Sequence, residues 1–394
     1  MRTTLLYSMF FLAIPLMAQR PEERRTAFLQ NIEKNNTTLV ALRQQVVADK
    51  AQNRIGNALP DPTFGFSYSW GNQEGMEGKK TFSAEQTLDL GVLSGQRKKA
   101  VAAENAVVDG NYLLERQTIL AEADLLLVQL IYENAVCEEW SARMERALQL
   151  KDLYENKLKA GDVNQIEVNK IRLYYTAALA NYRKAEADRK MTIDQLRRMN
   201  GDQPVNCGYT QYGPIQLPEL RELESKVQEL SPQIKQAYAK VQKEKDNLKL
   251  SKIEGLPEIS VGYTGEHVGG NNYNGVSVGV SLPIWGNTRR KVSQQRTAVL
   301  AADMNLKDVE TQTVARLKLQ YENARRLIEV ALQFTESINK NEDLEILRKA
   351  LDLGQMSLLE YLTEVSYYDD LHLQAIEVER DSQIALSKLY SIFN

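Results

Sequence analysis

The sequence predicts a mostly α-helical chain with a small β part placed in a membrane, and three observations lead to this fold class. The same unit occurs twice along the chain, each copy contains two strand-like segments, and each pair of strands is followed by a very long segment without proline. Alternation of apolar and small residues with period two is typical of strands. Long segments with apolar residues at heptad spacing are typical of coiled-coil helices.

The internal repeat is clearest around two glycines. The segment LKAGDVNQIEVNKIRLYY aligns without a gap with LDLGQMSLLEYLTEVSYY, so that Gly161 falls on Gly354 and Glu167 falls on Glu360. Self-similarity of this kind predicts that both halves fold into the same supersecondary unit. The expected domains are a first repeat over 19–200, a linker over 201–216 and a second repeat over 217–394.

Residues 1–18 have the composition of a secretory signal peptide, with Arg2 before a short apolar stretch and Ala18 at the expected cleavage position. Pro15 interrupts the apolar stretch, which is shorter than the ~20 residues that a transmembrane helix needs. No cysteine lies near the cleavage position, so a thioether-linked lipid anchor is not expected there. We therefore expect any membrane attachment to come from the folded chain.

Both repeats are expected to contain the same elements in the same order. In the first repeat, Gly56 followed by Pro60 and Pro62 ends the first helix. The long segments would extend ~95–100 Å as helices, at ~1.5 Å per residue. The first repeat is expected to contain a helix over 22–57, a β-hairpin over 62–90, a long helix over 94–158 and a helix over 163–199. The second is expected to contain a helix, a β-hairpin over 257–284 with a loop over 267–275, a long helix over 287–352 and a helix over 357–393.

The predicted strands have one apolar face and one face of small residues. Large residues alternate with Gly65, Ser67 and Ser69 in the first hairpin, and with Ser260 and Gly262 in the second. Such small residues are too small to fill a barrel core, whereas an apolar face toward lipid and a small polar face toward water suit a transmembrane barrel. A sheet packed on a soluble domain is the alternative. The predicted lipid-facing residues are Phe64, Phe66, Tyr68, Trp70, Val261, Tyr263, Val278 and Val280.

The predicted strands are too few to close a barrel within one chain, because transmembrane barrels begin at about eight strands. An open strand edge is excluded from lipid, where its backbone groups find no hydrogen-bond partner. The strands must therefore be shared between chains, with lipid of the membrane around them. A conducting lumen that continues into a ring of helices favours about three or more chains.

The composition argues against a nucleic-acid partner and offers no catalytic or metal-binding group. The formal net charge is −3, whereas nucleic-acid binding normally needs a basic surface. Cys137 and Cys207, and likewise His267 and His372, are far apart in the sequence and show no ligand spacing. We expect no cofactor, no metal and no enzyme activity, because no nucleophile, base and orienting group occur together. A disulfide between the two cysteines is left open.

With these features the chain resembles the TolC-like outer-membrane efflux protein family, over essentially its whole length after the signal peptide. The resemblance rests on LPDPTFGFSYSW, FSAEQTLDLGVLSGQRKKAVAAENA and KLKAGDVNQIEVNKIRLYYTAALANYRKAEA, and on LPEISVGYT, VSLPIWGNTRRKV and LGQMSLLEYL in the second half. It implies a homotrimer that forms a β-barrel in the outer membrane of a Gram-negative bacterium, a periplasmic α-barrel and an equatorial linker. The implied partners are a periplasmic adaptor (membrane fusion protein) and an inner-membrane pump of the RND or ABC type.

The resemblance also implies a function and site residues. The expected function is the passive exit duct of a tripartite efflux or type I secretion system. The turns at Gly161 and Asp162, and at Gly354 and Gln355, match the periplasmic tips that close the channel and meet the adaptor. Acidic residues beyond the second tip commonly form the constriction in the family. The expected entrance gate consists of Glu360, Glu364 and Glu167, for each of which a solvated helix surface is the alternative.

The cargo and one competing class of protein are left open at this point. The turns LDLGVLSGQRKK and LPIWGNTRRK look most like the cation-efflux branch of the family, but no methionine cluster, histidine run or CxxC motif supports metal handling. The competing class is a periplasmic coiled-coil adaptor or scaffold. Such a protein should show one helical hairpin with compact β domains, whereas this sequence predicts two helical hairpins in tandem.

Overall fold

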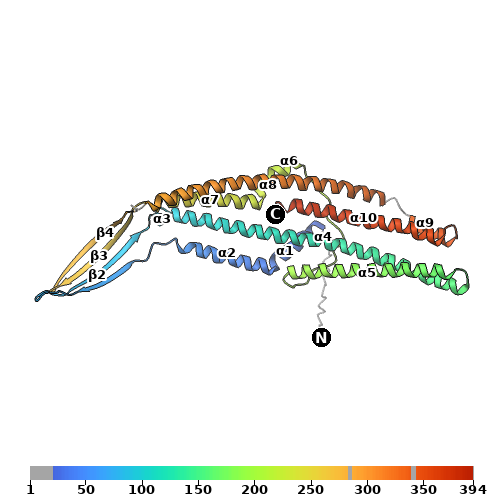
Figure 1. Ribbon diagram of the computed structural model, residues 1–394, viewed down its shortest axis with the longest axis horizontal. Helices are drawn as coiled ribbons and strands as arrows, with labels where there is room; N and C mark the ends of the chain where they lie inside the picture. Colours follow the sequence, from blue (N-terminus) through green and yellow to red (C-terminus); the bar gives the residue numbers. More distant parts are fainter. Residues whose placement is uncertain (1–20, 283–285, 339–342, 394) are drawn as a thin grey trace, which may run out of the picture. The chain divides into compact units, whose positions relative to one another are not determined.

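The computed structural model describes residues 21–282, 286–338 and 343–393, so the predicted signal peptide over 1–18 lies outside the described residues (Figure 1). The chain forms two compact units, each assembled from segments that are distant in sequence. The helical unit comprises the described residues of Met1–Asn36, Ala123–Gln216 and Ile328–Ile384. The β unit comprises those of Thr37–Glu122, Leu217–Leu327 and Ala385–Asn394. In the part of the chain that the structure describes, no helix combines the length and the apolar character needed to cross a membrane.

The β unit contains one antiparallel sheet and the helices that lead into and out of it. Its four strands follow the order β1-β2-β3-β4. The strands are β1 (Thr63–Ser69), β2 (Lys79–Leu88), β3 (Glu258–Val268) and β4 (Asn271–Ser281). The helices are α2 (Thr37–Ile55), α3 (Leu90–Leu93), α6 (Leu220–Leu230), α7 (Pro232–Ile253) and the first parts of α4 (Gln96–Ala160) and α8 (Asn287–Ile338).

The two predicted β-hairpins join into a single sheet through β2 and β3. Ala84 of β2 pairs with Phe64 of β1 on one side and with Tyr263 of β3 on the other. Since β3 pairs further with β4, the strands β1 and β4 are left at the two edges of the sheet.

The loop predicted over 267–275 is wrong, because β3 and β4 continue through most of it. Only Gly269 and Gly270 form the turn, with φ angles of +58° and +81°. A two-residue hairpin turn of this kind requires positive φ at both central positions, which glycine adopts without strain. His267 and Asn272 pair across the two strands directly beside the turn.

The helix predicted over 22–57 is divided at Asn36 into α1 (Pro21–Asn35) and α2. The buried amide of Asn36 donates to the carbonyl oxygen of Met199 at 2.9 Å. The corresponding helix of the second repeat is divided between α6 and α7, where Pro232 takes the first position of α7. Proline suits that position because its missing N–H would have no helical partner there.

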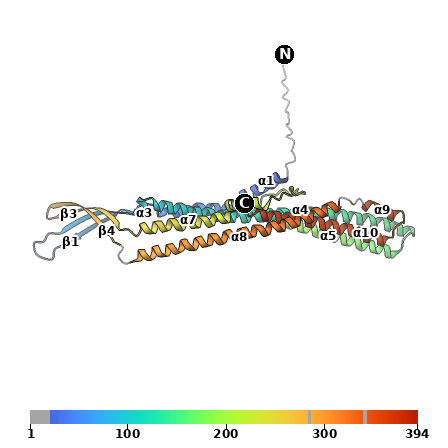
Figure 2. The ribbon, with the colours of Figure 1, turned by 90° about the horizontal axis from the view of Figure 1, so that it is seen from above.

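The helical unit contains α1, the later part of α4, α5 (Gln165–Met199), α9 (Asp343–Asp352) and most of α10 (Leu358–Tyr390). After the turn at Gly161, α5 folds back along α4, as both ribbon views show (Figures 1 and 2). The long helix predicted over 287–352 is described as α8 and α9, and residues 339–342 between them lie outside the described ranges. The division into two sequence repeats remains a prediction.

Candidate functional site

The register of the sheet places large apolar side chains on one face. Residues paired directly across antiparallel strands project to the same side of a sheet. Val261 pairs with Val278, and Ile259 with Val280, on the side that also holds Phe64 and Tyr263. This apolar face consists of Phe64, Phe66, Tyr68, Phe82, Ala84, Leu88, Ile259, Val261, Tyr263, Val276, Val278 and Val280. It includes every predicted lipid-facing residue that lies within a strand, and the exposed Trp70 follows β1.

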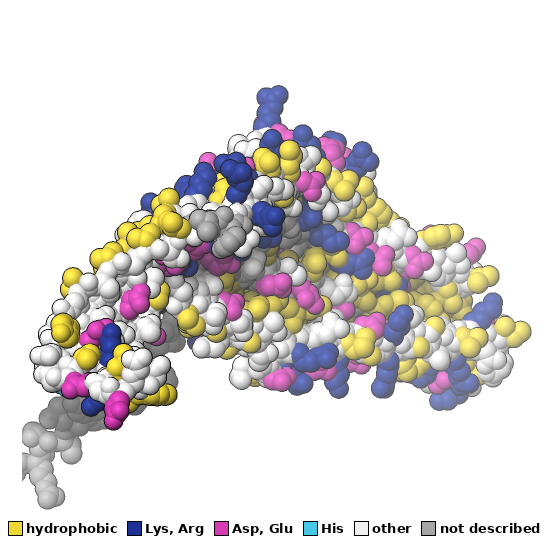
Figure 3. Space-filling model, turned by 60° about the vertical axis from the view of Figure 1, so that its left-hand side comes forward, with side chains coloured by type: hydrophobic (Ala, Val, Ile, Leu, Met, Phe, Trp, Pro, Cys, Tyr) yellow, Lys and Arg dark blue, Asp and Glu magenta, His cyan; other side chains and the backbone are white. Residues whose placement is uncertain are grey.

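The apolar face is not covered by the rest of the described chain. The side chains of Phe66 and Val278 are both 71% exposed, and no helix makes more than marginal contact with the sheet in the described ranges. Hydrophobic side chains are accordingly visible at the surface of the sheet in Figure 3. A continuous apolar surface of this kind marks a region that meets lipid or another protein.

The opposite face of the sheet is lined by small and polar residues in close contact. Gly65 pairs with Ser83, Gly262 with Ser277, and Ser260 with Gly279. A Cβ atom added to Gly65 would lie 2.6 Å from Ser83 Oγ. The close approach of Ser83 therefore favours a residue without a side chain at Gly65. The face also carries charge, including an ion pair of Lys79 with Glu266 at 2.7 Å.

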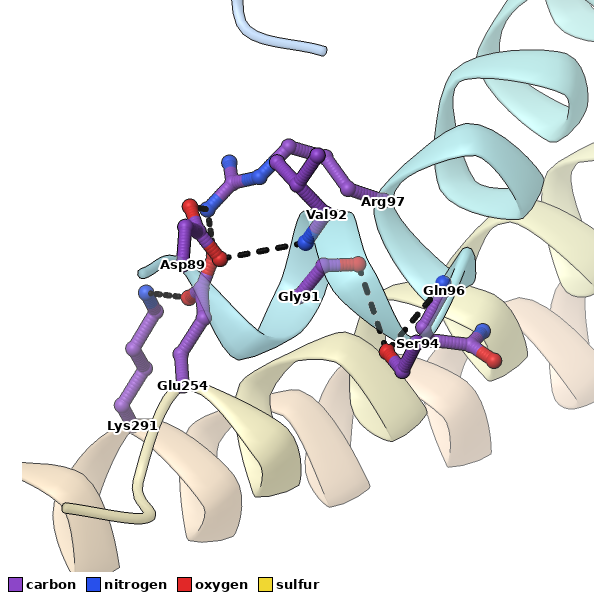
Figure 4. A network of polar contacts seen from close by, with 8 residues as sticks. All are labelled: Asp89, Gly91, Val92, Ser94, Gln96, Arg97, Glu254 and Lys291. Carbon is purple, nitrogen blue, oxygen red and sulfur yellow. Dashed lines mark hydrogen bonds and ion pairs between the residues drawn. The ribbon is translucent and has the colours of Figure 1, made fainter. Parts of the chain in front are cut away.

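A polar network at the foot of the sheet connects helices from both halves of the chain (Figure 4). Asp89 caps α3 by accepting a hydrogen bond from the backbone N–H of Val92 at 3.2 Å. Arg97, at the start of α4, contacts Asp89 Oδ2 at 2.8 Å and Glu254 Oε1 at 3.0 Å. Lys291, at the start of α8, contacts the other oxygen of Glu254 at 2.6 Å. The network fixes where the strands leave the helices.

The sequence patterns do not predict this network. Its basic members lie in the runs RKK over 97–99 and RRK over 289–291, which follow the two hairpins. No sequence pattern connects the acidic members, because Asp89 and Glu254 belong to different halves of the chain and meet only in the folded β unit.

The two tip turns have the same backbone geometry. Gly161 and Gly354 adopt φ angles of +83° and +71°. In each turn, the N–H of the next residue, Asp162 or Gln355, donates to a carbonyl five residues earlier at 2.9 Å. This is the Schellman arrangement, which satisfies the last carbonyls of a helix and favours glycine at the left-handed position. The geometry of these turns follows directly from the sequence.

The predicted gate residues Glu167 and Glu360 both act at a helix N-terminus. Glu167 accepts a hydrogen bond from the N–H of Asn164 at 3.1 Å, and the Asn164 side chain accepts from the N–H of Glu167 at 3.0 Å. Glu360 forms the same reciprocal pair with Ser357, at 2.8 and 3.3 Å. This capping box satisfies two N–H groups at the start of a helix.

The capping boxes explain why a glutamate recurs at this position in both halves. The hydrogen bond from the Ser357 N–H lowers the pKa of Glu360, because it favours the charged carboxylate. Glu364 lies exposed one turn further along α10. Whether these three carboxylates line a pore is a separate matter that remains a prediction.

A hydrophobic cluster connects the two tip hairpins in the helical unit. It packs side chains of α4 and α5 against those of α9 and α10. Its buried members are Leu150, Tyr154, Val168, Ile171, Leu351, Leu358, Tyr361 and Val365. Other apolar residues beside the same turns point outward, and the exposed ones are Ile166, Leu173, Leu353, Leu359 and Tyr367.

A buried charged cluster holds α4 against α10. Glu139 accepts from Arg143 Nε at 2.5 Å and contacts His372 Nδ1 at 2.8 Å. Arg143 also donates to the backbone oxygen of Asp369, and Arg146 contacts the Asp369 carboxylate at 2.6 Å. Although burial opposes its charge, the hydrogen bonds from His372 and Arg143 lower the pKa of Glu139 to about 2. The hydrogen bond to Glu139 raises the pKa of His372.

The cysteines and histidines are not assembled into a site. Cys137 and Cys207 are both free thiols, and burial raises the pKa of Cys137. His267 lies on β3 and contacts Asn272 Oδ1 at 2.7 Å, whereas His372 belongs to the charged cluster of the helical unit. Over the residues that the structure describes, no three His, Cys, Asp or Glu side chains are grouped as metal ligands.

The long helical hairpins and the four-stranded sheet with one bare apolar face define a class of fold, the TolC-like fold of outer-membrane efflux channels. No protein-family model matches the sequence, and no curated protein matches it in sequence. Solved structures of outer-membrane channels are similar to this chain in fold. CusC, described as forming a transmembrane channel, superposes with a TM-score of 0.74 at 14% identity, over 94% of this chain and 92% of CusC.

Two further channels superpose equally well. The CmeC outer-membrane channel of Campylobacter jejuni gives a TM-score of 0.72 at 16% identity, over 94% of this chain and 85% of CmeC. The MtrE outer-membrane channel of Neisseria gonorrhoeae, in its open state, gives 0.73 at 14% identity, over 94% of this chain and 88% of MtrE. The property shared at these identities is the fold.

Proposed function

We propose that this chain is the outer-membrane exit duct of a tripartite export system and conducts its cargo passively. The observation that carries the proposal is the sheet, which has one bare apolar face, one small polar face and two unpaired edges. The likeness of the whole fold to outer-membrane channels supports the same function. The duct needs no catalytic group.

The two edges of the sheet require other copies of the chain in this proposal. The strands β1 and β4 have backbone groups that the described sheet leaves without strand partners. Lipid cannot hydrogen-bond such groups, so β1 of one copy pairs with β4 of the next until the barrel closes. A homotrimer, as in the TolC-like family, is the expected assembly.

The tip turns take the adaptor-docking role in this proposal. Ile166, Leu173 and Leu359 are large apolar side chains, each more than half exposed, beside Gly161 and Gly354. Exposed apolar side chains clustered beside turns are typical of protein contact surfaces. They fit the helical hairpin of a periplasmic adaptor, which connects the duct to an inner-membrane pump. The carboxylates of Glu360, Glu364 and Glu167 form the entrance gate.

Cysteine cross-linking tests the sharing of strands. Cys137 and Cys207 are first replaced by alanine, and cysteines are then placed on the edge strands at Ser67 and Ser277, and at nearby positions of the same face to sample the register. Oxidation in native outer membranes should give covalent oligomers up to the closed ring. The matched control places cysteines at Ser83 and Thr264, which pair within one chain and should give only monomers.

The outcomes separate the two classes of protein left open by the sequence. A chain that fractionates away from the outer membrane, or that spans lipid as a monodisperse monomer, would refute the duct. Recovery with the soluble periplasmic fraction would favour an adaptor or scaffold. Purified oligomers should also give stepwise conductance in planar bilayers.

A further inference from the structure

The apolar face of the sheet contains a hollow close to the hairpin turns. Its volume is about 350 Å³. Gly265 lies at its centre in the register, between Phe82 of β2 and Asn274 of β4. Because Gly265 has no side chain, the surface is recessed there while the neighbouring side chains form the walls.

The walls of the hollow change in character along the strands. Toward the helices they are aromatic, with Phe66, Phe82 and Tyr263. Toward the turns the neighbouring residues are polar. Lys80 of β2, His267 of β3 and Asn272 of β4 lie side by side there in the strand register. A ligand that fits such a hollow has an apolar part beside a charged or polar group.

Positive charge is available at the polar end of the hollow. Within the described ranges Lys80 forms no ion pair. Glu266 also lines the hollow, and its carboxylate is paired with Lys79 of the opposite face at 2.7 Å. His267 lies beside Lys80 in the strand register, and its Nδ1 contacts Asn272 Oδ1 at 2.7 Å. Together they match the oxygens of a phosphate group.

Acidic groups nearby disfavour a free anion. The Glu77 carboxylate lies against Gly269 in the turn, two positions from His267. Its charge opposes the approach of a small anion from water. A phosphate attached to an acyl chain is held in addition by burial of that chain against the aromatic walls. The hollow therefore favours a phosphorylated lipid over free phosphate.

We propose that the hollow over Gly265 binds the phosphate and an adjoining acyl chain of a phosphorylated lipid in the outer leaflet of the membrane. The inference rests on the proposed function, which places the apolar face in lipid. The turn ends of the strands are the ends remote from the helices of the β unit (Figure 1). With periplasmic helices, these ends lie at the outer leaflet.

Native mass spectrometry of the full-length oligomer tests the proposal, with diphosphorylated lipid A as the probe. The wild type should bind lipid A, and the variant Lys80→Gln with His267→Gln should bind it about tenfold more weakly, because it loses the lysine charge and the imidazole that face the phosphate. Gly265→Leu should weaken binding to a similar extent by filling the hollow. A Cβ at Gly265 meets only Asn274 Oδ1 at 3.5 Å and Tyr263 Cε1 at 4.0 Å, so this variant should fold.

The matched control is Lys79→Gln, which removes a lysine from the adjacent position but on the opposite face, and it should bind lipid A as the wild type does. Dephosphorylated lipid A should bind weakly, and excess inorganic phosphate should not displace the lipid. Equal binding by the wild type and the double variant would overturn the proposal. Displacement by inorganic phosphate would overturn it as well, because the site would then be one for a free anion.

Bilayer conductance of the same samples separates the two proposals. If the oligomer inserts and conducts but binds lipid A independently of Lys80 and His267, only the lipid site is refuted. If the wild-type protein neither inserts nor conducts, the exit duct itself is refuted, and the lipid site with it.

Discussion

The sheet of the β unit and the tips of the helical unit differ in which side chains are exposed. At the tips, apolar residues such as Leu150 and Ile171 are enclosed between helices, as in any water-soluble protein. In the sheet, Phe66 and Val278 are exposed, and the opposite face carries Gly and Ser instead. The difference fits the proposed function, in which the tips lie in water and the sheet lies in lipid.

The largest effect on stability is expected in the buried core beside the tip turns, where apolar side chains are enclosed between helices. Leu150 is 1% exposed in the cluster that joins the tip hairpins. Leu150→Ala should lower the free energy of unfolding by ~2–5 kcal/mol, because it leaves a cavity in a packed core. Thermal unfolding of the oligomer, followed by circular dichroism, measures the loss. Leu173→Ala, at a position that is 72% exposed, is the control and should change stability little.

Arginine substitutions on the two faces of the sheet test whether the apolar face lies in lipid. Phe66→Arg should cost ~2–4 kcal/mol if the position lies near the middle of the membrane, because the charge must enter hydrocarbon. Ser67→Arg, on the opposite face of the same strand, should be tolerated better. The amount of heat-modifiable oligomer in outer membranes measures both. Equal assembly of the two variants would remove the distinction between the faces.

The charged cluster of the helical unit should make its stability depend on pH in two opposite directions. His372 has a raised pKa, so its contribution is complete below its unfolded pKa of about 6.5 and is lost as the pH rises through the folded value. Glu139 has a lowered pKa of about 2, so its contribution is lost as the pH falls from about 4.5 toward 2.

Comparison of the wild type with His372→Gln isolates the effect of the histidine. The wild type should lose about 1 kcal/mol between about pH 6 and about pH 8, a small value because His372 is half exposed. The variant should show no such loss over this interval. Unfolding midpoints at the two pH values are the measurement, and an unchanged slope in His372→Gln would assign the pH dependence to other groups.

The smallest effect on stability is expected at the predicted gate residues, where a substitution can separate the capping role of a side chain from its charge. Glu360→Gln keeps a side chain that completes a capping box, so it should change stability by only a few tenths of a kcal/mol. If the carboxylates line the entrance, Glu360→Gln with Glu364→Gln and Glu167→Gln should reduce cation selectivity in planar bilayers. Ser357→Ala is the converse control, because it removes a capping hydroxyl and leaves every carboxylate in place. Selectivity that survives the three glutamine substitutions would show that these residues only start helices.

The sequence by itself determined the features that depend on near neighbours along the chain. Alternation in Phe64–Trp70 determines which side chains share a face, since successive residues of a strand point to opposite sides. Gly161 and Gly354 determine the tip turns, because the left-handed backbone position favours glycine. The short turn at Gly269 and Gly270 was missed although it depends on local chemistry. The helix break at Asn36 was missed as well, and there the buried amide bonds Met199, which is far away in the sequence.

Only the tertiary structure decided the features that depend on residues far apart in sequence. The pairing of β2 with β3 joins two hairpins that carry no sequence signal for each other, and it leaves β1 and β4 as the edges. The network of Asp89, Arg97 and Glu254 and the buried cluster around Arg143 arise in the same way. A charged residue in a heptad pattern looks the same in sequence whether it faces water or a partner on another helix. Which of the two it meets depends on how the helices pack.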